Sequence, residues 1–188
     1  MSDVTTSYGT WCNQVAPYST SPDADVVDFV GQGDSEWLEL LEKSGALADI
    51  QTAYREKIND ALPSRVALCG DEFIGPHQPD DNEFDGYPTK ENGSLDIAAC
   101  VEDIDLAAIV EYYDPLTLED IGRDVMKSTA KEPAKAASRT MNRLGVKAFW
   151  HGPNPDSGRI QSYYRAGEVQ AALAARPGKG NRSERATA

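Results

Sequence analysis

Residues 131–165 read KEPAKAASRTMNRLGVKAFWHGPNPDSGRIQSYYR, and this stretch decides the fold of the second half of the chain. Proline is tolerated in the first turn of a helix, and glycine favours the position just after the last turn. Pro133 and Gly145 therefore predict a helix over 133–144. Its apolar positions recur at intervals of three and four: Ala134, Ala137, Met141 and Leu144. This spacing predicts an amphipathic helix whose small alanines let a neighbouring helix approach closely.

The opposite face of this helix is basic and polar. It carries Lys135, Arg139, Asn142 and Arg143. A helix fits the major groove of duplex DNA, where Arg pairs with guanine and Asn with adenine, and Lys and Arg also neutralise phosphates. We therefore interpret this face as a DNA reader. The competing interpretation is a solvated surface, which is the more common role of a charged helix face taken alone.

The segments on either side of this helix complete an order of elements. Before it, Thr117 can cap a helix over 117–125 whose first turn is acidic, as the helix dipole favours. After it, two β-prone runs flank residues that are typical of turns: Val146–Trp150 and Ile160–Tyr164. Two helices followed by a hairpin predict a winged helix-turn-helix domain, with His151 and Arg159 at the wing tip beside the duplex backbone.

The predicted winged domain spans 115–177. It ends in a helix over 166–175, and a basic flexible tail is expected over 178–188. The connector 126–132 between the two helices is longer than the turn of about three to four residues that is usual in this motif. The placement of helix 133–144 therefore depends on how this connector folds.

Charge is unevenly divided along the chain. The formal net charge of the whole chain is −13. Residues 1–114 contain 24 Asp and Glu against 5 Lys and Arg, whereas residues 115–188 contain 7 against 13. An asymmetry of this size indicates that the basic part contacts nucleic acid.

The acidic residues 1–114 predict a small α+β domain, so the fold class of the chain is expected to be α+β. Its patterns predict helices over 34–44, 47–62 and 105–113, a hairpin over 65–74 and a half-buried strand over 95–101. We expect residues 19–33 to be a polar lead-in with one short apolar turn. Residues 75–93 are rich in Pro, Gly and Asp and predict a long loop.

The run from Arg143 to Gly180 resembles the second half of the excisionase/MerR-like winged helix-turn-helix domains of actinobacterial genomes and their mobile elements. In those domains a recognition helix ends in Gly, a wing hairpin follows, and an aromatic-Arg-x-x-(Asp/Glu)-Val segment packs the next helix onto the core. The segment YRAGEV at 164–169 matches that pattern, and AARPGKG at 174–180 matches the common ending. The resemblance covers about residues 116–180.

The resemblance implies a sequence-specific double-stranded DNA-binding protein. Its role would be transcription regulation, or an accessory part in recombination or maintenance of a mobile element. Such domains usually occupy two half-sites, so we expect a homodimer or a protein partner through residues 1–114. The residues expected to contact DNA are Lys131, Lys135, Ser138, Arg139, Asn142, Arg143, His151, Arg159, Arg176, Lys179 and Arg182.

A second hypothesis places the activity in the acidic residues 1–114. They would form a protein-interaction module that mimics the charge of DNA and occupies a basic partner, without DNA-binding activity of its own. Neutralising Arg139 and Arg143 separates the two hypotheses, because only the first one needs these cations.

Catalytic and metal-binding chemistry is weakly represented, so we do not expect an enzyme, a cofactor or a metal site. Asp81, Glu83 and Asp85 followed by Gly86 approximate the start of an EF-hand loop, but Asn92 stands where a bidentate Glu is needed. A metal-dependent hydrolase is a third interpretation. It would use Asp71, Glu72 and Asp85, but no Lys, His or further carboxylate follows at an informative spacing.

Cysteine content and hydropathy bear on the compartment. The three cysteines are Cys12, Cys69 and Cys100, and their wide spacing favours reduced thiols. No run approaches the roughly 20 consecutive apolar residues that cross a bilayer, and the first residues do not resemble a secretory signal. The expected location is therefore cytoplasmic, with no membrane partner.

Overall fold

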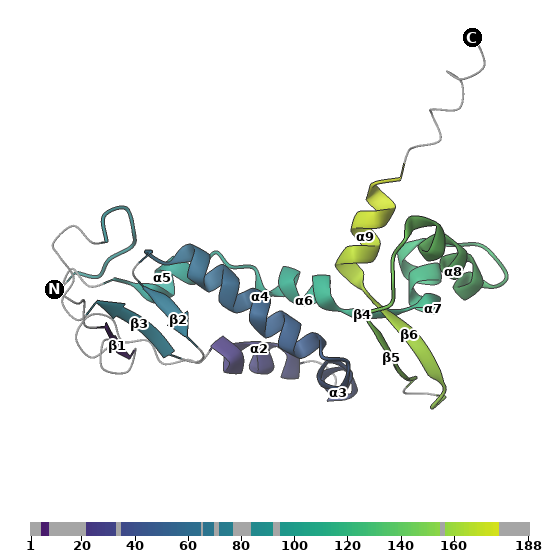
Figure 1. Ribbon diagram of the computed structural model, residues 1–188, viewed down its shortest axis with the longest axis horizontal. Coiled ribbons are helices and arrows are strands. Elements are labelled where there is room, and N and C mark those ends of the chain that lie inside the picture. The colour runs from purple at the N-terminus through teal and green to yellow at the C-terminus, as the bar shows by residue number, and fades with distance from the viewer. Residues whose placement is uncertain are drawn as a thin grey trace, which may run out of the picture. The chain divides into compact units, whose positions relative to one another are not determined.

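The computed structural model describes residues 5–7, 22–32, 35–64, 66–69, 72–76, 84–91, 95–154 and 157–176. Contacts divide the chain into two compact units (Figure 1). Unit 1 comprises residues 1–38 and 47–109, and unit 2 comprises 39–46 and 110–188. Both contain helices and a small antiparallel sheet, so the chain is α+β as predicted.

Unit 1 combines helices with a sheet in the order β1-β3-β2. Its strands are β1 (Thr5–Ser7), β2 (Ala67–Cys69) and β3 (Glu72–Pro76). Its helices are α2 (Pro22–Gly31), α4 (Ala46–Ala61) and α5 (Ile97–Val101), while α3 (Ser35–Ser44) and α6 (Leu106–Tyr113) each span the division between the units. Fully buried residues of this unit include Val26, Val30, Ile50, Ile58 and Leu95.

Two local predictions for unit 1 are confirmed. Helix α4 occupies the predicted 47–62 segment to within a residue, and it buries Ile50, Tyr54 and Ile58, which are four residues apart and so share one face. Strands β2 and β3 form the predicted hairpin, with Cys69 opposite Glu72. Both elements arise from patterns that are complete within a short stretch of chain.

Two other predictions for unit 1 are wrong. Residues 22–31 form the helix α2, because Pro22 opens it and Val26 and Val30, one turn apart, are both fully buried. Residues 97–101 form the helix α5 instead of continuing a strand. The carboxylate of Asp96 accepts a hydrogen bond from the backbone N–H of Ala99, and this cap turns the alternating pattern into the start of a helix.

Unit 2 is built around a second antiparallel sheet, of order β4-β6-β5. Its elements in chain order are β4 (Pro115–Thr117), α7 (Leu118–Asp120), the π-helix η1 (Ile121–Val125), α8 (Pro133–Leu144), β5 (Trp150–Pro153), β6 (Ile160–Arg165) and α9 (Ala166–Ala174). The strand β4, which pairs Leu116 with Tyr164, was not predicted. Its partner β6 follows about fifty residues later in the chain. No pattern within the short segment 115–117 therefore indicates this pairing.

The first helix of unit 2 begins at the predicted cap. The Thr117 hydroxyl accepts from the Asp120 backbone N–H at 3.2 Å, and the Asp120 carboxylate accepts from the Thr117 backbone N–H at 2.9 Å. This reciprocal pair is a capping box. The helix then widens into the π-turn η1, so the predicted helix over 117–125 is present but is not regular throughout.

The core of unit 2 uses the predicted inner face of α8. Ala137 and Met141 are buried and form a cluster with Ile121, Tyr164 and Val169. Leu144 is half-buried and packs against the same cluster, and Ala134 is half-buried. The small side chain of Ala137 lets η1 and α8 pack closely, because no bulky group separates them there.

Candidate nucleic-acid interface

Helix α8 is held close to the preceding helical segment by a glycine. A Cβ on Gly122 would lie 2.5 Å from the backbone oxygen of Pro133, so only glycine leaves room for the start of α8. The connector between the helices is hydrogen-bonded to the same turn. Its Ser128 backbone N–H donates to the Gly122 carbonyl at 2.9 Å, and Met126 donates to Ile121 at 2.8 Å. The connector is therefore long but anchored.

The two ends of α8 are set by the residues that predict them. Pro133 stands in the first turn, and Gly145 follows the helix in the left-handed region at φ 74°. The Gly145 backbone N–H donates to the last turn of the helix. These local signals place α8 over the predicted range 133–144, so the direction of its outer face follows from the sequence.

The basic face of α8 is exposed. Lys135, Arg139 and Asn142 succeed one another at intervals of four and three, so they lie in one line along the helix. Arg143 lies beside this line and is also exposed, as is Lys131 before the helix. Ser138 is half-buried. The cations and the amide are thus positioned to meet a ligand, whereas Ser138 is less accessible.

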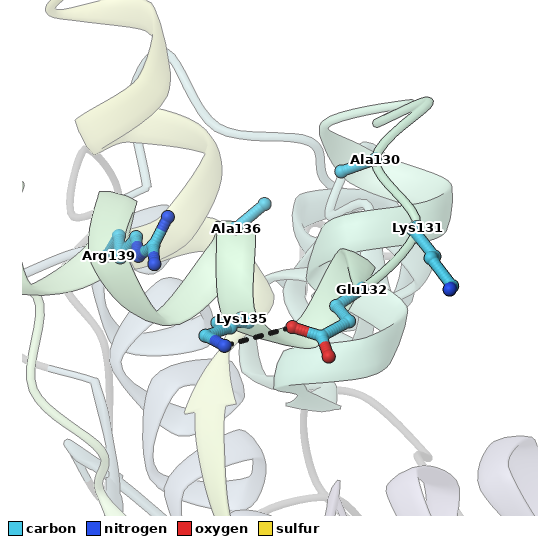
Figure 2. A pocket seen from close by; sticks show the side chains of 6 residues that line it. All are labelled: Ala130, Lys131, Glu132, Lys135, Ala136 and Arg139. Carbon is cyan, nitrogen blue, oxygen red and sulfur yellow. Dashed lines mark ion pairs between the residues drawn. The ribbon is translucent and has the colours of Figure 1, made fainter.

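A shallow pocket of about 310 Å³ lies at the start of α8 (Figure 2). It is lined by Ala130, Lys131, Glu132, Lys135, Ala136 and Arg139. Three of these side chains are positive and one is negative, so the pocket has an excess of positive charge. Lys135 Nζ lies 3.1 Å from Glu132 Oε2, and both side chains are more than half exposed.

The hairpin of β5 and β6 is closed by a hydrogen-bonded turn. The Asn154 backbone N–H donates to the Arg159 carbonyl at 2.8 Å, and Gly158 adopts a left-handed φ of 65°. Arg159 and Ile160 are exposed, and Ile160 retains 72% of its accessible surface. His151 is exposed too, but it lies within β5, where its Nδ1 is 3.1 Å from Ser162 Oγ on β6.

Aromatic packing stiffens this hairpin. The ring of Trp150 covers Gly152, where a Cβ would come within 1.9 Å of the indole. Trp150 also packs on Tyr163, with 4.9 Å between ring centroids. The Tyr163 hydroxyl donates to the Pro153 carbonyl at 3.0 Å. The exposed residues near the turn are therefore carried on a braced pair of strands.

Arg165 and Glu168, from the segment on which the resemblance depends, pack within unit 2. The Arg165 guanidinium lies over the rings of Tyr113 and Phe149, at 5.5 Å and 5.2 Å from their centroids. Its Nη1 is 3.2 Å from Glu168 Oε1. These contacts connect the end of β6 to α6, to the residue before β5 and to the first turn of α9. Arg165 therefore has a structural role in unit 2.

The predicted basic tail over 178–188 lies outside the described residues. Arg176 follows α9 and is half-buried, and its Nε and Nη2 atoms are buried without a hydrogen-bond partner among the described residues. Lys179 and Arg182 lie outside the described residues. The tail therefore adds no observed contact surface to the candidate interface.

Most residues of the two metal-site interpretations lie outside the described residues, namely Asp71, Asp81, Glu83 and Asn92. Among the residues that the structure describes, no group of three or more His, Cys, Asp or Glu side chains could hold a metal ion. Burial, followed by the charge of Asp96, raises the pKa of the Cys100 thiol, which disfavours a reactive thiolate there. Within the same described part, no helix has the length and apolar character needed to span a membrane.

Comparisons of this chain with protein-family models, with curated proteins and with solved structures yield no match. The resemblance to excisionase/MerR-like domains therefore stays a prediction. Function has to be inferred from the residues and geometry of unit 2 and from the charge of residues 1–114.

Proposed function

We propose that unit 2 is a winged helix-turn-helix domain that binds double-stranded DNA, with α8 as its reader and the β5–β6 hairpin as its wing. The observation that carries this proposal is the outer face of α8. It presents Lys135, Arg139, Asn142 and Arg143 to solvent, while Ala137 and Met141 anchor the opposite face in the core. A supported helix with an exposed polar face suits the major groove.

The side chains of this face have distinct roles in the proposed complex. Arg139, Asn142 and Arg143 would lie against base edges, because Arg and Asn form bidentate pairs with guanine and adenine. Lys131 and Lys135 would contact phosphates near the start of α8, and Arg159 would contact the backbone beside the hairpin. The Gly122–Pro133 approach supports this assignment, because it limits the angle at which α8 leaves the connector.

The proposed role is regulation of transcription or an accessory part in recombination or maintenance of a mobile element, carried out in the cytoplasm without an enzymatic step. The acidic residues 1–114 would supply a dimer contact or a partner site. Their 24 carboxylates against 5 cations would repel DNA and lower non-specific binding by the basic residues 115–188. Specific binding would then depend on well-placed base contacts.

Fluorescence anisotropy of the full chain with duplex DNA tests this proposal. The probes are a random duplex and the region upstream of the protein's own gene, each titrated across a salt series. We expect affinity to fall steeply with salt and to drop at least about tenfold in an Arg139→Gln, Arg143→Gln double variant, because two contacts worth about 1–3 kcal/mol each are removed.

A matched control distinguishes reader contacts from general charge. Lys57→Gln removes an exposed cation from α4 in unit 1 and should leave affinity unchanged within about twofold. If both variants lost the same affinity, the effect of the Arg139 and Arg143 substitutions would be explained by net charge alone. Absence of binding to either duplex beyond the roughly 10⁻⁴–10⁻⁶ M range of non-specific contacts would disprove the proposal.

The charge of residues 1–114 supports a second candidate function. A content of 24 Asp and Glu against 5 Lys and Arg suits a module that imitates DNA and occupies a basic protein. In that case the Arg139→Gln, Arg143→Gln variant would behave as wild type in every assay. Neutralising exposed carboxylates of α4, such as Glu56 and Asp60, would instead abolish activity.

A further inference from the structure

Glu132 stands at the start of the proposed reader helix, in a position whose usual role it does not perform. It is the N-cap residue of α8, where a side-chain oxygen normally accepts from the first turn. Among the described residues, the Glu132 carboxylate makes no such cap bond and instead pairs with Lys135 at 3.1 Å. Figure 2 shows the two side chains pointing toward one another, with Lys131 directed away from the pair.

Stability alone is a weak explanation for this ion pair. The Lys135 and Glu132 side chains retain 62% and 65% of their accessible surface. Exposed pairs of this kind contribute about 0–1 kcal/mol, because water screens them and both side chains lose freedom. The larger effect of the carboxylate is on the surface potential of the pocket, where it partly cancels Lys131, Lys135 and Arg139.

We propose that Glu132 is a built-in competitor for DNA phosphate, which holds Lys135 in the free protein and thereby weakens binding to any duplex whose phosphate has to reach Lys135. This inference rests on the proposed function. A phosphate approaching Lys135 has to displace the carboxylate or lie beside it. Both alternatives weaken the phosphate contact of Lys135, so a complex without the base contacts of Arg139, Asn142 and Arg143 is left with low affinity.

The size of the effect follows from the charges. Lys135 loses its attraction to the carboxylate when it turns to a phosphate. An exposed pair of this kind contributes about 0–1 kcal/mol, so its loss lowers affinity by up to about fivefold. If one more phosphate contact forms when the carboxylate is absent, the slope of log K against log salt concentration steepens by up to about 0.9.

Glu132→Gln in the full chain tests this inference by anisotropy with random and upstream duplexes over the same salt series. We expect a gain of about two- to fivefold in affinity for the random duplex, a steeper salt slope and a similar gain for the upstream duplex. In a Lys135→Gln background, the same substitution should give less than half of this gain in log affinity, because the carboxylate acts through Lys135.

Glu119→Gln is the matched control. It also removes one carboxylate from an exposed ion pair of unit 2, the pair with Arg123, but it lies outside the pocket at the start of α8. It should leave the affinity for the random duplex unchanged within about twofold. Thermal unfolding of both variants, monitored by circular dichroism, checks that the same fraction of each is folded at the temperature of the binding assay.

The outcomes separate this inference from the proposed function. If the wild-type chain binds DNA through Arg139 and Arg143 but Glu132→Gln behaves like Glu119→Gln, only the role of Glu132 is disproved. A loss of affinity in Glu132→Gln would likewise overturn it, by indicating a direct favourable contact. If neither the wild type nor the variant binds either duplex, both proposals fail.

Discussion

The two units use the same rules of packing and present opposite chemistry to solvent. Unit 1 buries apolar side chains such as Ile50 and Ile58 completely, and unit 2 buries a cluster that includes Ile121 and Met141. Acidic side chains prevail in residues 1–114 and basic ones in residues 115–188. Core composition therefore does not distinguish the units, and the proposed difference in function would come from their surfaces.

The largest expected effect comes from removing a core side chain in one unit only. Met141→Ala leaves a cavity beside Ile121 and Tyr164 and should lower the free energy of unfolding of unit 2 by about 2–5 kcal/mol. Ile58→Ala should do the same to unit 1. Thermal unfolding followed by calorimetry should show separate transitions, of which each substitution moves one.

DNA binding sharpens this test. Above the shifted transition, Met141→Ala should abolish binding at a temperature at which Ile58→Ala retains it. A single transition that moves equally in both variants would contradict the division into two cooperative units. It would indicate instead that the acidic and basic parts fold as one.

An intermediate effect is expected where the backbone of one helix meets another. Gly122→Ala should destabilise unit 2 by about 1–3 kcal/mol, because its Cβ would lie 2.5 Å from the Pro133 oxygen. Gly31→Ala at the end of α2 meets nothing within 4 Å, and it should be neutral or stabilising by up to about 1 kcal/mol. Urea titration of each variant measures the difference.

The same glycine bears on the proposed reader. If the contact sets the angle of α8, Gly122→Ala should also weaken DNA binding under conditions in which unit 2 is fully folded. Equal stability changes in Gly122→Ala and Gly31→Ala would show that helix propensity dominates at both sites. The proposed role of the Gly122–Pro133 approach would then be wrong.

The smallest expected effect lies in the acidic unit. Burial, and then the charge of Asp28, raises the pKa of Asp25 above its ordinary value of 3.8. Because the folded pKa is raised, the stability linked to the protonated form is present below 3.8 and is lost as pH rises through the raised folded value. Asp25→Asn should remove this loss and stabilise unit 1 at neutral pH by less than about 1 kcal/mol.

The control for this prediction is Asp28→Asn, which removes the second cause of the shift but not the first. It should recover a smaller part of the stability than Asp25→Asn does. Urea unfolding at pH 3.5, 5 and 7 measures both. A greater loss of stability with rising pH in Asp25→Asn than in wild type would contradict the sign of the shift.

Elements with complete local signals were predicted well. Helix α8 carries its start in Pro133, its end in Gly145 and its inner stripe in Ala137 and Met141. The cap at Thr117 was likewise predicted, whereas the reciprocal bond from Asp120 that completes the capping box was not. By contrast, the alternating apolar residues of 95–101 predicted a strand, and the structure shows a helix capped by Asp96. A short alternating run is ambiguous when a capping residue lies inside it.

The candidate interface divides in the same way. The exposure of Arg139, Asn142 and Arg143 follows from helical spacing alone, and the structure agrees with it. The pairing of Glu132 with Lys135 could have been suspected from their spacing of three. The absence of a hydrogen bond from the Glu132 carboxylate to the first turn of α8 could not. The burial of Arg176 atoms was not predicted. His151 lies inside β5 because this strand occupies 150–153 and not the predicted 146–150.

The sequence by itself determined the segregation of charge, the bounds of α8 and the identity of its outer face. Each of these depends on residues within a few turns of one another, where capping and side-chain periodicity act. Only the tertiary structure decided that β4 joins the hairpin through β6, that the long connector is anchored to Gly122, and that Arg165 packs between Tyr113 and Phe149. The β4–β6 pairing and the contacts of Arg165 need segments far apart in the chain to meet, and the burial that brings them together leaves no local pattern.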